Sequence, residues 1–522
     1  AGYQLVLSGE ADLDGLPPFV RAAAAQAAGE RGLPAGSHVV TLSRSLIVPF
    51  LTFSTRRDLR EAAWRAWVGR GENEGETDNR EVAREILRLR QEQAWMHGFE
   101  SYADYALANS MAGNVASVNN LLDDVYARAL DALADEREAV REALRGAGVP
   151  PPTMAWDWRF GAELVRRQRY AFDDGEVKPY FSLERMVQAA FDCAHRLFGI
   201  RMVRNDAIPV YHPDVVAYEV HDVGVPATAA EADAAPARGR LVGIFLHDNF
   251  ARQTKRSGAW MSALRWQCRN GGVELPVILN NNNFAKGAPG EPALLSFDDA
   301  RTLFHEFGHG LHGLLSDVTY QRLSGTNVLR DFIELPSQLF EHWLLEPEVI
   351  ARHARHWRTG APMPATLVRR LQEARRWGQA YDTVRYAGSA LVDMAVHSRI
   401  DKEPPADLAE FEAATLARLK LPPEVGVNHR LLHFQHLFSG PAYAAGYYVY
   451  LWAEVLDADA FDAFKEAGDP FDPATAARLR RCVYAAGDSV APQQAYAAFR
   501  GRQPSIGPLL RKRGLLPEDV EY

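Results

Sequence analysis

The sequence has few cysteines, no excess of basic charge and no long apolar run. Only three of its 522 residues are cysteines, namely Cys193, Cys268 and Cys482, and they are widely spaced and match no metal-ligand pattern. We therefore expect free thiols and a reducing compartment. Acidic residues outnumber basic ones by 67 to 58, which gives a formal net charge of −9. This balance argues against nucleic acid as a partner, because binding phosphates needs a concentrated basic surface.

No run of about 18 uninterrupted apolar residues is present, so the sequence predicts no membrane-spanning helix. The chain begins at Ala1 without Met and without a basic-then-apolar leader, so no targeting segment can be read from this end. We expect that the natural N-terminus is missing. The cytoplasm is the expected location, with the periplasm as the alternative because a signal on a missing N-terminus would be invisible.

A metal-ligand pattern begins at His305. Residues 305–309 read HEFGH, and two histidines four residues apart fall on one face of a helix. Such a pair can chelate zinc, which needs a third ligand and, in a catalytic site, keeps one position for water. Glu306 is turned by roughly 100° from His305 and suits a general base that reaches the water without binding the metal. Ser296 to Asp299 form a variant capping box, which predicts the start of this helix.

Two carboxylates follow at a helical spacing. Glu334 and Glu341 are seven residues apart, so a helix through residues 331–343 would place both on one side. One can bind a metal, while Glu341 or Asp331 can accept the distal N–H of a ligand histidine. Pro336 would remove one helical hydrogen bond and kink this helix.

Three tyrosines recur at helical spacing closer to the C-terminus. Tyr443, Tyr447 and Tyr450, followed by Glu454, fit the i, i+4, i+7, i+11 pattern of one helix face. A buried phenol needs a hydrogen-bond partner, so three phenols on one face favour a polar cavity. The alternative is ordinary aromatic packing, which the spacing alone would favour.

These motifs resemble the thimet oligopeptidase group of zinc peptidases, which includes oligopeptidase A and the bacterial dipeptidyl carboxypeptidases. The resemblance is carried by HEFGH at 305–309, ELPSQ at 334–338 and HLFSGPAYAAGYYVYLW at 436–452, and it extends from about residue 40 to the C-terminus. It implies that one zinc ion is bound by His305, His309 and Glu334.

The resemblance also implies roles for the third motif. His436, Tyr443 and Tyr450 would stabilise the transition state, and Tyr447 would contact the substrate. The family is usually richer in glycine just before the first tyrosine, whereas this chain has Ser-Gly-Pro-Ala at 439–442. The position of Tyr443 is therefore less well defined than that of Tyr450.

The fold implied by the resemblance is mainly α-helical. Two helical lobes would enclose a deep channel, with a small β-sheet beside the zinc-binding helix, and the channel would admit only short, unstructured peptides. The segment 323–334, LSGTNVLRDFIE, looks more like the dipeptidyl carboxypeptidase branch. We therefore expect release of C-terminal dipeptides, with Arg330 as a candidate to bind the terminal carboxylate.

Two other functions remain as alternatives. One is an endo-oligopeptidase of the same fold that cuts internal bonds of short peptides, and the other is a zinc-containing binding protein without catalysis. Short peptides are the expected partners, rather than nucleic acid or a membrane, and we expect a monomer.

Periodicity along the chain divides it into three regions. Residues 1–200 predict a mainly helical lobe segment, 201–300 a small β-sheet region and 301–522 the helical zinc-binding catalytic region, all within one contiguous catalytic unit. Residues 38–53 predict one or two strands, and the four asparagines at 280–283 predict a polar loop.

Overall fold

The fold consists of two compact units, each assembled from separate segments of the chain. It is given by a computed structural model, which describes residues 2–170, 174–226, 228–252, 255, 258–287 and 290–517. Unit 1 spans Ala1–Phe172, Arg370–Tyr448 and Arg513–Leu515, and unit 2 spans Asp173–Arg369, Val449–Lys512 and Leu516–Tyr522. This division differs from the three consecutive regions predicted from the sequence, because residues 370–448 pack with the N-terminal helices.

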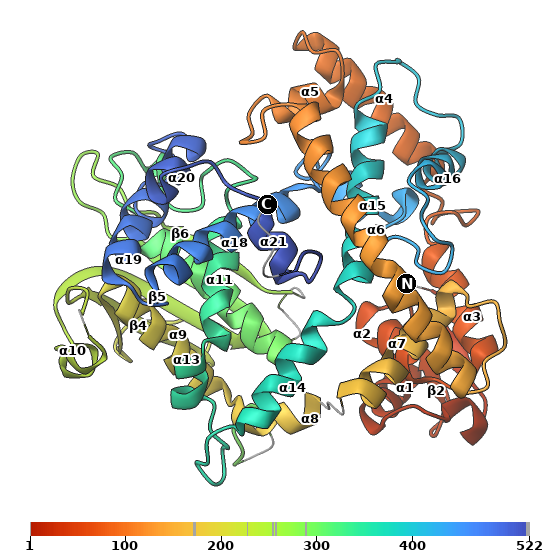
Figure 1. Cartoon of the computed structure of the whole chain (residues 1–522), viewed down its shortest axis with the longest axis horizontal. Helices are drawn as coiled ribbons and strands as arrows, with labels where there is room; N and C mark the ends of the chain where they lie inside the picture. The colour runs from red at the N-terminus through yellow and green to blue at the C-terminus, as the bar shows by residue number, and fades with distance from the viewer. Residues whose placement is uncertain are drawn as a thin grey trace. The chain divides into compact units, whose positions relative to one another are not determined.

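Unit 1 is helical apart from one short pair of strands. Its two longest helices, α6 (Val115–Gly146) and α15 (Gln379–His397), lie side by side (Figure 1). The boundary with unit 2 falls inside α14 (Ala365–Arg376). Its elements are β1 (Leu5–Leu7), α1 (Pro18–Gly29), β2 (His38–Val40), α2 (Arg44–Phe53), α3 (Arg57–Val68), α4 (Arg80–Met96), α5 (Tyr102–Leu107), α6 (Val115–Gly146), α7 (Ala155–Tyr170), α15 (Gln379–His397), α16 (Leu408–Arg418) and α17 (Gln435–Phe438).

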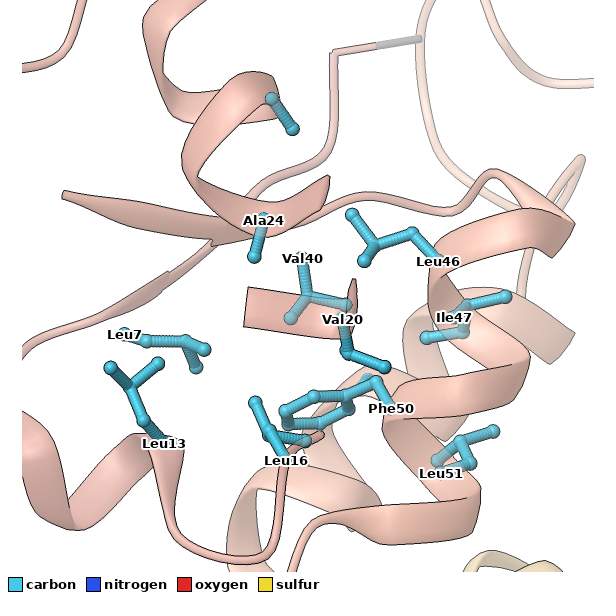
Figure 2. Close-up of a cluster of buried hydrophobic side chains, with 12 residues drawn as sticks. Leu7, Leu13, Leu16, Val20, Ala24, Val40, Leu46, Ile47, Phe50 and Leu51 are labelled. Atoms are coloured by element: carbon cyan, nitrogen blue, oxygen red, sulfur yellow. The ribbon is translucent and has the colours of Figure 1, made fainter. Parts of the chain in front are cut away.

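A hydrophobic cluster of unit 1 corrects one sequence prediction. Figure 2 shows Val20 of α1 and Val40 of β2 beside Leu46, Ile47 and Phe50 of α2, all of them buried. The prediction of one or two strands for residues 38–53 is right only for β2. The buried positions of α2 recur at a helical spacing, and the resulting face covers the cluster although Pro49 lies inside the helix.

Unit 2 contains a five-stranded sheet in the order β3-β4-β5-β7-β6. The strands are β3 (Ile200–Arg204), β4 (Val215–Asp222), β5 (Arg240–Phe250), β6 (Trp260–Arg265) and β7 (Val277–Phe284), and only the β5–β7 pair is parallel. The polar loop predicted at residues 280–283 is wrong, because all four asparagines lie in β7. Asn280 and Asn282 are fully buried there, and Asn282 Nδ2 donates to Asn249 Oδ1 at 2.9 Å.

The rest of unit 2 is mainly helical. They are α8 (Asp174–Val177), α9 (Leu183–Phe198), α10 (Ala229–Ala234), α11 (Phe297–Leu314), α12 (Leu335–Glu341), α13 (Pro347–His353), α18 (Val449–Ala467), α19 (Pro473–Leu479), α20 (Pro492–Arg500) and α21 (Gly507–Lys512). Helix α11 packs against β5, β6 and β7, so the prediction of a mainly α fold with a small sheet beside this helix is confirmed. The enclosed channel stays a prediction. None of the helices in the described part of the chain has the length and apolar character needed to cross a membrane.

Candidate functional site

Helix α11 begins where the sequence predicts. The Asp299 N–H donates to Ser296 Oγ at 3.1 Å and the Ser296 N–H donates to Asp299 Oδ2 at 3.0 Å, which completes the capping box. The helix continues to Leu314, so His305 and His309 are one turn apart on the same face.

Glycines let α11 approach its neighbours closely. A Cβ atom at Gly308 would lie 2.7 Å from both the carbonyl oxygen of Pro336 and Cα of Ser337, and one at Gly313 would lie 2.6 Å from Cδ1 of Ile278 in β7. Only hydrogen fits at Gly308, because the neighbouring atoms belong to the backbone of α12. The small residue within the HEFGH motif therefore brings the segment that carries Glu334 against the two histidines.

Glu334 is the residue before the first turn of α12. The helix predicted for residues 331–343 begins later than expected, at Leu335, and Pro336 lies in its first turn, where a missing N–H breaks no helical hydrogen bond. The predicted kink is therefore wrong. The Tyr484 hydroxyl donates to the Pro336 carbonyl at 2.9 Å, and the Ser337 hydroxyl to Glu334 Oε2 at 3.1 Å, so both helix start and carboxylate are held in place.

His305, His309 and Glu334 converge on one point. Glu334 Oε2 lies 3.3 Å from His305 Nε2 and 3.3 Å from His309 Nε2, and the candidate ligand atoms of the three residues all lie within 4.8 Å of one another. Ligands about 2.0 to 2.2 Å from a tetrahedral zinc ion lie about 3.3 to 3.6 Å apart. Two imidazole nitrogens and one carboxylate oxygen at this spacing fit zinc and leave one corner for water.

A second carboxylate orients the first histidine. Glu341 Oε1 lies 2.6 Å from His305 Nδ1, and Arg301 Nε lies 3.9 Å from the other oxygen of Glu341. Glu341 therefore occupies the position that fixes the ring and leaves Nε2 for a metal. Asp331, the other candidate for this contact, is fully buried in the turn before α12.

Burial and charge act in opposite directions on these groups. Burial opposes ionisation of Glu334, but hydrogen bonds from His305 and His309 lower its pKa well below the usual value. Burial likewise disfavours a charged His305, yet the carboxylates of Glu334 and Glu341 raise its pKa. The arrangement favours a carboxylate at Glu334, the form that binds a cation.

Glu306 is poised differently from the ligand candidates. The residue is only 6% exposed, and among the described residues its Oε2 atom meets no hydrogen-bond partner. Burial raises the pKa of Glu306, although His305 and His309 counteract part of this effect. A buried carboxylate with a raised pKa and an unused oxygen can accept a proton from a nearby water.

Arg330 does not lie on a helix with Glu334. It is exposed and belongs to the turns that precede α12. The premise that a helix carries Arg330 one turn before Glu334 is therefore wrong, although its role as a carboxylate-binding residue stays a prediction.

Tyr443 and Tyr447 also lie outside any helix. Helix α18 begins only at Val449, so it carries Tyr450 and Glu454 but not the two earlier tyrosines. The single helix face predicted for these residues is therefore wrong. Ala445 interrupts the helical path because its φ of 51° lies in the left-handed region, which is rare for residues other than glycine.

Three predicted residues of the third motif, His436, Tyr443 and Tyr447, form a cluster in unit 1. The ring centroid of His436 lies 5.5 Å from that of Tyr443 and 5.2 Å from that of Tyr447. Burial raises the pKa of Tyr447 to about 12 and lowers the pKa of His436. Both side chains are therefore neutral at pH 7 and can donate a hydrogen bond.

The structure thus collects the predicted residues in two groups. His305, Glu306, His309, Glu334 and Glu341 meet in unit 2, which also contains Tyr450, while His436, Tyr443 and Tyr447 meet in unit 1. Sequence reasoning missed the supporting contacts of Ser337 and Tyr484, for which the sequence carries no spacing signal.

Comparison with known proteins gives the family. The profile of Peptidase family M3 matches residues 50–515. Dipeptidyl carboxypeptidase of Salmonella typhimurium is 37% identical over 505 residues, which cover 96% of this chain and 72% of that protein. The Escherichia coli protein of the same name is 36% identical, with 98% and 73% covered, and oligopeptidase A of Haemophilus influenzae is 33% identical, with 99% and 74% covered. The chain belongs to peptidase family M3, a family of metallopeptidases.

Proposed function

We propose that this protein is a zinc peptidyl-dipeptidase, which releases dipeptides from the free C-terminus of short peptides. The observation that carries the metal part of this proposal is the position of Glu334 Oε2, 3.3 Å from Nε2 of both His305 and His309. The donor set and its spacing suit zinc, which prefers nitrogen and oxygen ligands in a tetrahedral arrangement.

His305, His309 and Glu334 would hold the metal, and Glu306 would move the proton. A bound zinc ion lowers the pKa of water to about 7 and polarises a carbonyl group. Glu306 accepts the proton of the attacking water and then passes it to the amine that leaves. Its burial supports this role, because a raised pKa brings a carboxylate closer to the working pH of a general base.

His436, Tyr443 and Tyr450 would donate hydrogen bonds to the oxyanion that forms as the peptide bond is attacked, and Tyr447 would contact the substrate. Neutral donors suit this role, because they stabilise developing negative charge without carrying a charge themselves. The resemblance of residues 436–452 to the family motif supports these assignments, and so does the contact between the rings of His436 and Tyr443.

Release of dipeptides requires recognition of a terminal carboxylate. An anion left without a partner in a closed site costs several kcal/mol, so a cation or a group of donors must meet it. Arg330 is our candidate. The dipeptidyl carboxypeptidase names of two relatives at 36 and 37% identity support exopeptidase action. Oligopeptidase A at 33% identity keeps endo-oligopeptidase action as the second candidate.

Mass spectrometry of peptide digests separates the two candidates. The substrate is an N-blocked pentapeptide, offered with a free and with an amidated C-terminus, and the Glu306→Gln variant serves as the inactive control. We expect the free acid to yield a dipeptide and a blocked tripeptide, and amidation to reduce the rate at least about tenfold. Equal cleavage of both peptides at internal bonds would favour the endo-oligopeptidase.

We also propose a reducing compartment and a monomeric state. Cys193 and Cys268 are buried and Cys482 is partly buried, and all three are free thiols, which suits the cytoplasm. Cell fractionation tests the location against the periplasm, and light scattering of the purified protein tests the monomer.

A further inference from the structure

The loop that carries two of the proposed site tyrosines is held by a buried carboxylate. We call residues 439–448, which follow α17, the tyrosine loop. Asp393 of α15 is fully buried and accepts three of its backbone N–H groups: from Ala445 at 2.9 Å, from Gly446 at 3.0 Å and from Tyr447 at 3.0 Å. Successive N–H groups that point to one place form a concave anion site, and here the anion is a side chain of the same unit.

This contact explains the unusual backbone of the tyrosine loop. Ala445 has a φ of 51°, a conformation that L-residues other than glycine adopt only when the surroundings determine it. The turn at Ala445 is what points the three N–H groups at Asp393. Without the carboxylate, the loop would lose the interactions that offset this strain.

A second buried residue forms hydrogen bonds at the start of the loop. Arg90 of α4 donates to the carbonyl of Leu437 and to that of Gly440, the latter at 3.1 Å. Its other terminal nitrogen lies 3.2 Å from His397 Nε2. Arg90 is only 7% exposed, and these contacts use its terminal nitrogens within the protein.

His397 connects Arg90 to Asp393 through hydrogen bonds. A guanidinium group can only donate, so His397 Nε2 accepts from Arg90 and the ring proton is on Nδ1. Nδ1 lies 2.8 Å from Asp393 Oδ1, to which it donates. The chain of donors from Arg90 through His397 to Asp393 therefore connects both ends of the tyrosine loop, and every member of it is buried in unit 1.

We propose that Arg90, His397 and Asp393 act as positioning residues that fix the tyrosine loop, and with it the arrangement of Tyr443 and Tyr447 around His436. The proposal rests on the proposed function for its catalytic consequence. Its structural part stands separately, because loop order can be measured without substrate.

The test uses the nearly isosteric substitution Asp393→Asn. Each oxygen of Asp393 accepts from two N–H donors. Asparagine would put an NH2 group in place of one oxygen, and this group donates hydrogen bonds and cannot accept them. The matched control is Asp407→Asn in the same unit, since Asp407 accepts the N–H groups of Ala409 and Glu410 at the start of α16. Arg90→Lys, which keeps the charge but not the forked donor geometry, replaces Asp393→Asn if that variant does not fold.

Hydrogen exchange and steady-state kinetics are measured on the same samples. We expect amides of residues 444–448 to exchange at least about tenfold faster in Asp393→Asn, whereas exchange in α11 and zinc content stay at wild-type values. We expect kcat on the N-blocked pentapeptide to fall about 10- to 100-fold with KM nearly unchanged, because misplacement of positioned groups lowers the rate of the chemical step.

The outcomes separate the two claims. Wild-type exchange in residues 444–448 would overturn the positioning role of the three residues. Faster exchange with unchanged kcat would show that the residues hold the loop but would overturn the catalytic consequence, since the loop would then have no part in the reaction. A wild-type protein without peptidase activity would refute the proposed function, while the exchange data would still decide whether the three residues hold the loop.

Discussion

Gly308 of α11 and Ser337 of α12 are so close that a Cβ atom at Gly308 would lie 2.7 Å from Cα of Ser337. In α11 the ligand candidates His305 and His309 lie before and after Gly308. In the facing segment Glu334 comes shortly before Ser337. The distance between the two helices therefore sets the distance between the histidines and the carboxylate.

Gly308→Ala should weaken metal binding without touching a ligand. The added methyl group meets backbone atoms that cannot rotate away, and such overpacking costs about 1 to 3 kcal/mol or moves the helices apart. We expect lower zinc occupancy and a lower melting temperature. Gly146→Ala is the control, because a Cβ atom there meets nothing within 4 Å. Full zinc occupancy in Gly308→Ala would show that the close approach is not needed for the site.

Glu341→Gln should lower zinc affinity while leaving the three ligand candidates in place. Glu341 lies 2.6 Å from His305 Nδ1, and loss of such a supporting carboxylate typically weakens metal binding about 10- to 100-fold. Competition with a chelator of known affinity measures the change. Glu410→Gln, at an exposed position of α16, should bind zinc as the wild type does, and an equally unchanged Glu341→Gln would remove Glu341 from the site.

Glu136→Gln should change how the stability of unit 1 depends on pH. Glu136 of α6 accepts the N–H groups of Ala380 at 3.1 Å and Tyr381 at 3.0 Å, at the start of α15, where Gly378 offers no side chain. Burial raises the pKa of Glu136 from 4.5 to about 7, although these N–H groups oppose the shift. Between these pH values the unfolded chain releases the proton that the folded chain keeps, so stability falls as pH rises.

The size of this effect is on the order of 3 kcal/mol across that window. Urea unfolding at pH 5 and pH 8 measures this effect. The free energy of unfolding of Glu136→Gln, relative to that of the wild type, should be higher at pH 8 than at pH 5. Glu142→Gln, at an exposed position of the same helix, should show no such difference. If the free energies of unfolding of the wild type and of Glu136→Gln differed by the same amount at both pH values, the predicted effect would be contradicted.

Local patterns predicted helix α11 well, since its capping box and its HEFGH motif are short-range signals. The third ligand candidate came from the family resemblance, because Glu334 meets the histidines only after two helices pack at Gly308. The helix predicted through Tyr443 and Tyr447 failed for a tertiary reason. Their spacing is helical, but the N–H groups of residues 445–447 donate to Asp393, some 50 residues away in sequence. These N–H groups therefore do not form α-helical hydrogen bonds.

The asparagine tract failed for a similar reason. Asparagine favours turns, yet residues 280–283 lie in β7 between two neighbouring strands, and the Asn249 side chain accepts a hydrogen bond from Asn282. Burial in a central strand and a partner from another strand overrode the local preference.

The zinc content of His309→Ala tests the central claim most directly. Elemental analysis of the purified wild type should give one zinc ion per chain. His309→Ala should lose most of it, because two ligands cannot replace three, while His212→Ala, in the same unit, should keep it. Full zinc occupancy in His309→Ala would contradict the assignment of His305, His309 and Glu334 as the metal site.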